Sequence, residues 1–171
     1  RYIMGLESEF IAWNNGLKNG SRRDKECAVS NREFTEKDLL EKYQFPSVLD
    51  VGSGPISSRG TLSSSSSRER EEVCLLRACD PLAVAYDLLL EMHGMIPYVK
   101  TEFAFVERLT DKYAWDSFDI VTMRNALDHS YDPFTGIYEM LRVVKNGGVV
   151  RLIHRENEAE RTKEYGLHQW N

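Results

Sequence analysis

Three features are scarce in this sequence, and each absence excludes a class of function. No run approaches the roughly 18 apolar residues of a membrane span, and no signal peptide opens the chain. Positive charge is in the minority: 22 Lys and Arg stand against 27 Asp and Glu, and the net charge of −5 disfavours a nucleic-acid or anionic-membrane partner. Only three cysteines occur, an odd number without metal-ligand spacing, which indicates a reducing compartment. We predict a cytoplasmic protein without a membrane or nucleic-acid partner.

The length and the first 46 residues indicate one domain with a helical N-terminal segment. A chain of 171 residues, 42% of them hydrophobic, can bury a real core. It begins at Arg1 rather than Met, so we expect it to belong to a trimmed or longer polypeptide. Apolar residues recur in steps of three and four from Ile3 to Leu17, which predicts an amphipathic helix. A second helix is predicted from the capping box at residues 35–38, closed by Pro46.

Strand and helix patterns alternate from Ser47 onward. The continuous apolar run at residues 73–79 is typical of a strand that is buried on both faces. Such alternation predicts an α/β fold, with a mostly parallel sheet covered by helices on both faces. The predicted strands are residues 47–51, 73–79, 98–105, 118–123 and 149–153, and one predicted helix covers residues 83–92.

A further helix is predicted after Asp132, because Asp132-Pro133 supplies a cap and a first-turn proline in their preferred places. The glycines at the end of residues 145–148 terminate it. We expect its buried face to consist of Phe134, Ile137, Leu141 and Val144.

The stretch LSSSSSREREE, residues 62–72, has the composition of a flexible surface insertion. Five consecutive serines cannot bury apolar surface and favour local side-chain hydrogen bonds over helix. We assign this stretch no chemistry and place it inside a domain that extends over residues 47–171.

The stretch VLDVGSGPISSRG, residues 48–60, is the most informative of the chain. It predicts a strand that ends at Val51, with Asp50 at its exit, and then a turn, Gly52-Ser53-Gly54, whose bare backbone suits close approach to a ligand. A lone Gly-x-Gly is equally typical of a tight turn that binds nothing. Asp80 ends the next predicted strand, where its carboxylate can accept both hydroxyls of a ribose, and the polar run at residues 124–129 ends the fourth. Parallel strands bring these ends to one crevice.

Taken in order, VLDVGSGP, the strand ending in CDP, SFDIVTMRNALDH and MLRVVKNGGVVRL resemble the motifs of class I S-adenosylmethionine-dependent methyltransferases. The resemblance covers residues 47–153 and implies a Rossmann-like sheet with S-adenosylmethionine across the strand ends. It departs from the family at Ile56, which stands where a third glycine is usual. The family also closes its sheet with an antiparallel pair of strands, which residues 156–171 are too short to supply.

The resemblance also implies which residues bind the donor. Asp50 and the glycine turn would lie near its methionine part, and Asp80 would hold its ribose. The acid expected against the adenine falls on Phe105, so the backbone of Val106 and the side chain of Glu107 are the candidates instead. Asp128 would bind the donor's amino group or orient a base. The predicted donor-binding residues are Asp50, Gly52, Ser53, Gly54, Asp80, Pro81, Leu82, Val106, Glu107, Asn125 and Asp128.

Two histidines are candidates for the base that a hydroxyl or amine acceptor needs. His129 follows the fourth predicted strand at the rim of the crevice, and His154 ends the fifth at the same rim. His168 and Trp170, in the terminal tail, are interpreted as packing or lid residues. Because the histidines and nearby acids share no ligand spacing, we predict no metal site.

These observations favour a methyltransferase that acts on a small polar acceptor. A non-catalytic domain that keeps the fold as a binding or partner module is the main alternative, because of Ile56 and the short C-terminal region. An NAD(P)-dependent oxidoreductase would also use the glycines and Asp80. Against it stand Asp50 at the strand exit and the run from Asn125 to Asp128, which hydride transfer does not require.

Overall fold

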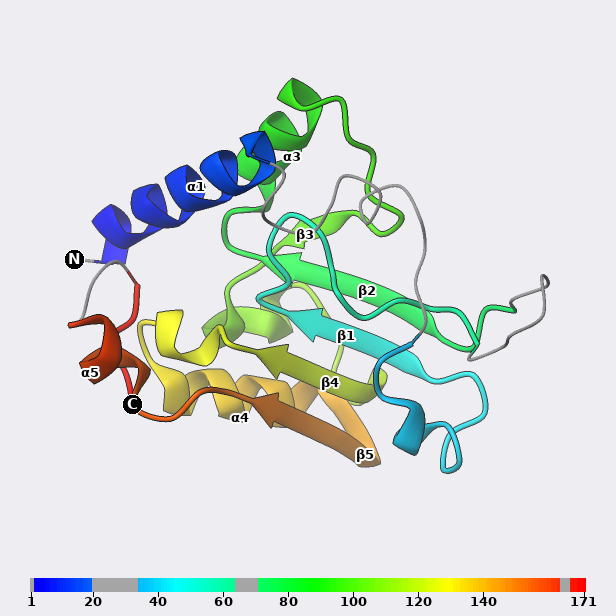
Figure 1. The fold of residues 1–171 in the computed structure, drawn as a ribbon. Helices are drawn as coiled ribbons and strands as arrows, with labels where there is room; N and C mark the ends of the chain where they lie inside the picture. Colours follow the sequence, from blue (N-terminus) through cyan, green and yellow to red (C-terminus); the bar gives the residue numbers. More distant parts are fainter. Residues whose placement is uncertain (1, 20–33, 64–70, 164–166) are drawn as a thin grey trace.

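The computed structural model describes residues 2–19, 34–63, 71–163 and 167–171, which form a five-stranded sheet with helices around it (Figure 1). The strand order is β3-β2-β1-β4-β5, and every neighbouring pair is parallel. The predicted mostly parallel α/β sheet is therefore confirmed. The strands are β1 Ser47–Val51, β2 Leu75–Asp80, β3 Thr101–Phe103, β4 Phe118–Arg124 and β5 Val144–Ile153.

The strand order reverses beside β1, and this reversal determines where a ligand can bind. The chain runs from β1 through β2 to β3 on one side and then crosses over to β4 on the other side of β1. The connections that leave the carboxyl ends of β1 and β4 therefore diverge and leave a crevice between them.

The alternation of side chains along the strands divides the core between the two faces of the sheet. On one face Leu49, Val51 and Val121 pack with residues of α4 (Pro133–Val143) and of the 3₁₀ segment η2 (Val106–Asp111). On the other face Val48, Leu76 and Ile120 pack around Phe34. β1 and β4 are buried on both faces, as is typical of central strands in a parallel sheet. β2 was predicted to be buried on both faces, but its first half alternates, because Leu75 and Arg77 are exposed.

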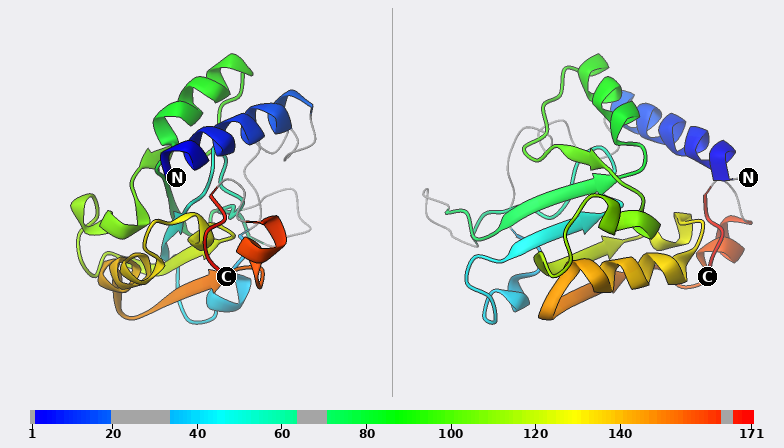
Figure 2. Two further views of the ribbon diagram at one scale, coloured as in Figure 1. Left: turned by 90° about the vertical axis from the view of Figure 1, so that its left-hand side faces the viewer. Right: turned by 180° about the vertical axis from the view of Figure 1, so that it is seen from behind.

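The N-terminal helix α1 (Tyr2–Lys18) is confirmed and packs against α3 (Ala83–Met92), as both figures show (Figures 1 and 2). The rings of Trp13 and Tyr86 meet edge to face at a centroid distance of 6.2 Å. Ile56, from the loop after β1, belongs to the same buried cluster. Its apolar side chain therefore contributes to the packing of α1 and α3, which a glycine at this position would not.

The second predicted helix is reduced to one 3₁₀ turn, η1 (Lys37–Leu39). The Thr35 hydroxyl donates to Glu36 at 2.5 Å instead of capping a helix, and the Glu36 side chain is drawn into the interior by Arg59. The two capping-box side chains are used for tertiary contacts: Thr35 accepts from Arg59 at 3.2 Å, and Asp38 accepts from Arg151 at 2.9 Å. The segment therefore lacks the side-chain cap on which the prediction depended.

The buried face predicted for α4 was wrong at Phe134 and Leu141, whereas Ile137 is half-buried and Val144, the first residue of β5, is buried as predicted. Asp132 caps the helix as expected, since its carboxylate accepts from the backbone of Phe134 and Thr135. Phe134 is nevertheless 82% exposed and Leu141 is 56% exposed. The helix instead buries Gly136, against which the Val106 side chain packs. Glu139, Met140 and Val143 complete this buried face.

Several predicted boundaries shift, and some predictions remain untested. Strand β3 is three residues long rather than eight, and β5 begins at Val144, directly after α4. Leu62 and Glu72 form an antiparallel bridge at the ends of the serine-rich stretch, whose residues 64–70 lie outside the described part of the chain. Among the described residues after β5 there is the short helix α5 (Glu158–Thr162) and no strand. The division at residue 46 stays a prediction.

Candidate functional site

A cavity of about 660 Å³ opens at the carboxyl ends of β1, β2 and β4, in the crevice that the strand order predicts. Every residue predicted to bind the donor lines it, and so does His129. His154 does not. The sequence reasoning did not select several other lining residues: Leu6, Glu9, Arg59, Arg155, Glu158 and Leu167.

The glycine turn needs glycine for two reasons. Gly52 and Gly54 have φ angles of +65° and +66°, in the left-handed region that side chains disfavour. An added Cβ would meet Ala126 Cβ at 2.5 Å from Gly52 and the Trp13 ring at 2.7 Å from Gly54. The turn therefore packs against α1 through Gly54 and against the loop after β4 through Gly52. Both of these segments line the cavity, so a side chain at either glycine would displace part of its wall.

Asp80 is held at the end of β2 with its carboxylate only partly used. One oxygen accepts from the Gly54 N–H at 3.1 Å, and the other accepts from the Leu82 N–H at 2.9 Å. A carboxylate oxygen has two lone pairs, so each oxygen keeps one for a ligand hydroxyl. Burial raises the pKa of Asp80 to about 6, against the effect of the two backbone hydrogen bonds.

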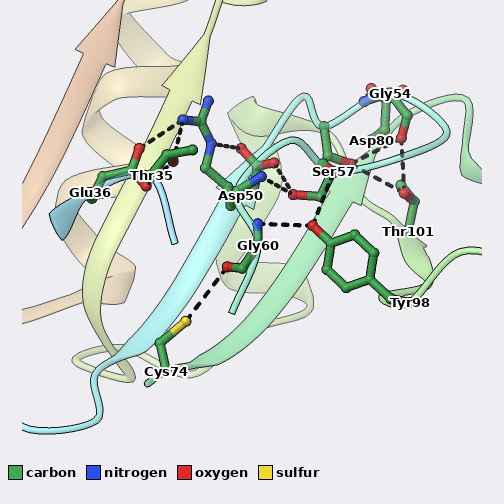
Figure 3. Close-up of polar contacts among 12 residues, drawn as sticks. Thr35, Glu36, Asp50, Gly54, Ser57, Gly60, Cys74, Asp80, Tyr98 and Thr101 are labelled. Carbon is green, nitrogen blue, oxygen red and sulfur yellow. Dashed lines mark hydrogen bonds and ion pairs between the residues drawn. The ribbon is translucent and has the colours of Figure 1, made fainter. Parts of the chain in front are cut away.

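Asp50 lies in a buried ionic network that the sequence reasoning missed (Figure 3). The Arg59 guanidinium donates to Asp50 at 3.2 Å and to Glu36 at 2.7 Å, and Ser57 donates to the second Asp50 oxygen at 2.6 Å. Burial disfavours the charge on Arg59, but the two carboxylates outweigh it and raise its pKa. Asp50 thus fixes the loop after β1 as well as lining the cavity. A buried carboxylate needs a cation or several hydrogen-bond donors, and Arg59, nine positions later, was the available signal for a cation.

Glu107 supports the opposite wall of the cavity. One of its oxygens accepts from the backbone N–H groups of Tyr131 and Asp132, at 2.8 and 3.2 Å. Burial raises its pKa. No hydrogen bond to another described residue engages its second oxygen, which is available to a ligand amine.

Polar atoms of Asp128, His129 and His168 converge at the rim of the same cavity. Nδ1 of His168 lies 2.5 Å from an Asp128 oxygen and 3.1 Å from Nε2 of His129. The same Asp128 oxygen lies 3.6 Å from Nε2 of His129. Burial lowers the pKa of His129, although the charge of Asp128 opposes the shift. The sequence predicts two members of this cluster but places His168 among packing or lid residues, because it follows Asp128 by 40 positions.

His154 follows β5 outside this cluster. Its two ring nitrogens are buried, and neither has a hydrogen-bond partner among the described residues. Burial lowers its pKa. Since it does not line the cavity, its predicted role as a base has less geometric support than that of His129.

The family is settled by comparison with known proteins. A family model described as a methyltransferase domain matches residues 49–152, which include most of β1, most of β5 and every residue predicted to bind the donor. The cavity-lining residues of α1 and of the C-terminal tail lie outside the match. The chain belongs to the methyltransferase domain family. This membership confirms the resemblance stated from the motifs, the Rossmann-like fold and S-adenosylmethionine as the donor of this methyltransferase domain.

Two curated relatives of the methyltransferase domain are the ubiquinone biosynthesis O-methyltransferases of Erwinia tasmaniensis and Photorhabdus laumondii. Each is 38% identical over 104 residues, which cover 60% of this chain and 40% of the relative. The matched region thus spans less than half the length of these relatives.

Two solved structures show the same fold. A Haloferax volcanii protein, solved in complex with a methyltransferase activator, has a TM-score of 0.58 at 16% identity, over 95% of this chain and 69% of that chain. The [4+2]-cyclase SpnF has a TM-score of 0.53 at 16% identity, over 90% of this chain and 61% of that chain. In the described part of this domain, no helix is long and apolar enough to cross a membrane.

The cavity of the methyltransferase domain fits S-adenosylmethionine in size and in chemistry. Its volume of about 660 Å³ falls within the roughly 300–1,000 Å³ typical of small-molecule sites. The spare lone pairs of Asp80 suit a vicinal diol, and the second oxygen of Glu107 suits an exocyclic amine. Trp13 closes the cavity over the glycine turn.

Proposed function

We propose that this chain transfers a methyl group from S-adenosylmethionine to a hydroxyl oxygen of a small polar acceptor. Asp80 carries the proposal: it is a buried carboxylate at the end of β2 that lines a cavity of the right volume, and each of its oxygens has only one backbone partner. The curated relatives are named O-methyltransferases, which supports oxygen as the atom that is methylated.

The donor is placed with its ribose at Asp80, its adenine toward Val106 and Glu107, and its methionine part toward the glycine turn. S-adenosylmethionine supplies an activated methyl group: the acceptor oxygen attacks the methyl carbon, the carbon–sulfur bond breaks, and sulfur keeps the electron pair. The protein therefore has to hold the acceptor in line with the methyl group and exclude water.

The acceptor is assigned to the side of the cavity that carries Asp128, His129 and His168. A hydroxyl must lose its proton as the new bond forms, and neutral imidazole groups promote such a transfer. Burial lowers the pKa of the His129 imidazole, which favours its neutral, proton-accepting form. This side of the cavity thus combines access to the donor with an imidazole that can accept the proton of the acceptor.

The experiment is methyl transfer from isotopically labelled S-adenosylmethionine to a panel of phenols, catechols and sugars, followed by mass spectrometry. Asp80→Asn keeps the size of the side chain but removes the charge that a ribose diol requires. We expect the apparent KM for the donor to rise at least tenfold, since each charge-assisted hydrogen bond contributes about 1.5–3 kcal/mol.

Asp87→Asn is the matched control, because Asp87 lies on α3 in an exposed ion pair with Lys100 and outside the cavity. We expect it to behave as the parent. Equal KM values for the donor in both variants would contradict the assignment of Asp80. Absence of transfer to every acceptor, with the donor bound, would instead favour the non-catalytic alternative.

A further inference from the structure

The most informative feature beyond the proposed donor site is the triangle of Asp128, His129 and His168. Its corners are an Asp128 carboxylate oxygen, Nε2 of His129 and Nδ1 of His168, and its edges measure 2.5, 3.1 and 3.6 Å. Only 11% of the Asp128 side chain, 19% of His129 and 27% of His168 is exposed, so these groups are not a freely solvated surface.

Hydrogen bonds alone do not explain why Nδ1 of His168 lies close to both Asp128 and His129. A ring nitrogen has one in-plane direction, occupied either by a proton or by a lone pair. Nδ1 of His168 is directed at Asp128 and at His129 together, so one proton can serve only one of these contacts with good geometry. A single ion at the centre of the triangle could be bound by all three atoms at once.

The dimensions and the atom types fit a metal ion. Metal–ligand bonds of about 2.0–2.1 Å in a tetrahedral zinc site place neighbouring ligand atoms about 3.3 Å apart. The three observed edges bracket this value. Two imidazoles and one carboxylate form a common three-residue set in catalytic sites for first-row divalent cations, with the remaining position open.

Hydrogen bonds of the neighbouring residues, in addition to the His168–Asp128 contact, hold His168 in position. In the same tail the Gln169 N–H donates to the Asp128 carbonyl at 3.0 Å, and the Trp170 indole donates to the Ser130 carbonyl at 2.8 Å. These bonds dock the tail on the loop after β4 and bring a third ligand to the two from η3 (Leu127–His129). Because His168 comes from a distant part of the sequence, spacing did not predict a metal site.

We propose that Asp128, His129 and His168 bind a divalent first-row cation, such as Zn²⁺, at the acceptor side of the cavity. His129 is then a ligand through Nε2 rather than a free base. The effect of the bound cation on catalysis rests on the proposed function. The cation would lower the pKa of an acceptor hydroxyl that binds at its open coordination position, and the proton released would pass to water. Cation binding itself does not depend on methyl transfer.

The test is calorimetric titration of chelator-treated protein with Zn²⁺, and a Co²⁺ titration followed by visible absorption, in which the d–d bands report nitrogen and oxygen ligation. The protein is the 171-residue chain without a polyhistidine tag. We expect one ion per chain. His168→Ala and Asp128→Asn should each weaken Zn²⁺ binding at least 10–100-fold, since even changes to groups that only orient ligands have effects of that size.

His93→Ala is the control: His93 ends α3, pairs with Asn14 and lies outside the cavity. It should bind Zn²⁺ as the parent does. Thermal melting checks the fold of each variant, and His168→Ala decides the matter if Asp128→Asn does not fold.

A parent that binds neither Zn²⁺ nor Co²⁺ would overturn the proposal and leave a cluster that only shares a proton. Retained affinity in a folded His168→Ala variant would overturn it too. Zn²⁺ binding without any S-adenosylmethionine binding would support this inference and contradict the proposed function, so the two failures are distinguishable.

Discussion

Replacement of Arg59 by Met should destabilise the protein by about 3–5 kcal/mol, the range for breaking a buried ion pair by removing one partner. The guanidinium bonds to Asp50 at 3.2 Å and to Glu36 at 2.7 Å, and all three side chains are at most 4% exposed. Met fills most of the volume but leaves two carboxylates buried without their cation. Urea denaturation, monitored by circular dichroism, measures the loss in the free energy of unfolding.

Arg108→Met is the matched control for Arg59→Met. Arg108 pairs with Asp111 at 2.7 Å, a distance equal to that of the Arg59–Glu36 pair, but the two side chains are 66% and 58% exposed. A solvated pair of this kind contributes less than about 1 kcal/mol. Adding Glu36→Gln to Arg59→Met should recover part of the loss, because one buried charge is removed. Losses of equal size in Arg59→Met and Arg108→Met would show that burial of the network does not make its cation more important than that of an exposed pair.

Three further predictions concern the site. The affinity for S-adenosylmethionine should fall as the pH drops through about 6, by up to about tenfold per pH unit, because Asp80 then gains a proton. In Asp80→Asn this pH dependence should vanish, and calorimetry at several pH values measures both affinities. Gly54→Ala should cost about 1–3 kcal/mol more in urea denaturation than Gly94→Ala, because both have positive φ but only Gly54 faces the Trp13 ring; equal costs would contradict the close packing of α1. His129→Ala should lower turnover at saturating substrates by roughly 100-fold or more and leave donor affinity within a few-fold, because His129 either accepts the acceptor's proton or holds the cation that acidifies the acceptor. Unchanged turnover would remove His129 from the mechanism.

The sheet and the donor side of the site were predictable because their signals are local. Val48, Asp50 and the glycine turn follow one another within seven residues, and Asp80 ends the next apolar run. In a parallel sheet the carboxyl ends of strands meet at one edge, so local motifs are enough to predict which residues share a crevice. Helix α3 was predicted to the residue for the same reason.

What was missed depends on contacts between distant segments. The capping box at residues 35–38 is locally sound, but Arg59 and Glu36 form a buried pair that no local pattern specifies. On α4 the exposed Phe134 and the buried Glu139 reverse the usual rule, because Glu139 accepts from both the backbone and the hydroxyl of Thr110. His168 reaches Asp128 only through the docking of the tail.

Whether the cavity binds S-adenosylmethionine can be measured by calorimetric titration of the 171-residue chain with S-adenosylmethionine, S-adenosylhomocysteine and NAD. We expect one site per chain for S-adenosylmethionine and for S-adenosylhomocysteine, weakened at least tenfold in Asp80→Asn, and no binding of NAD. Binding of NAD in place of the two sulfur compounds, or no binding of any of the three to folded protein, would contradict this expectation.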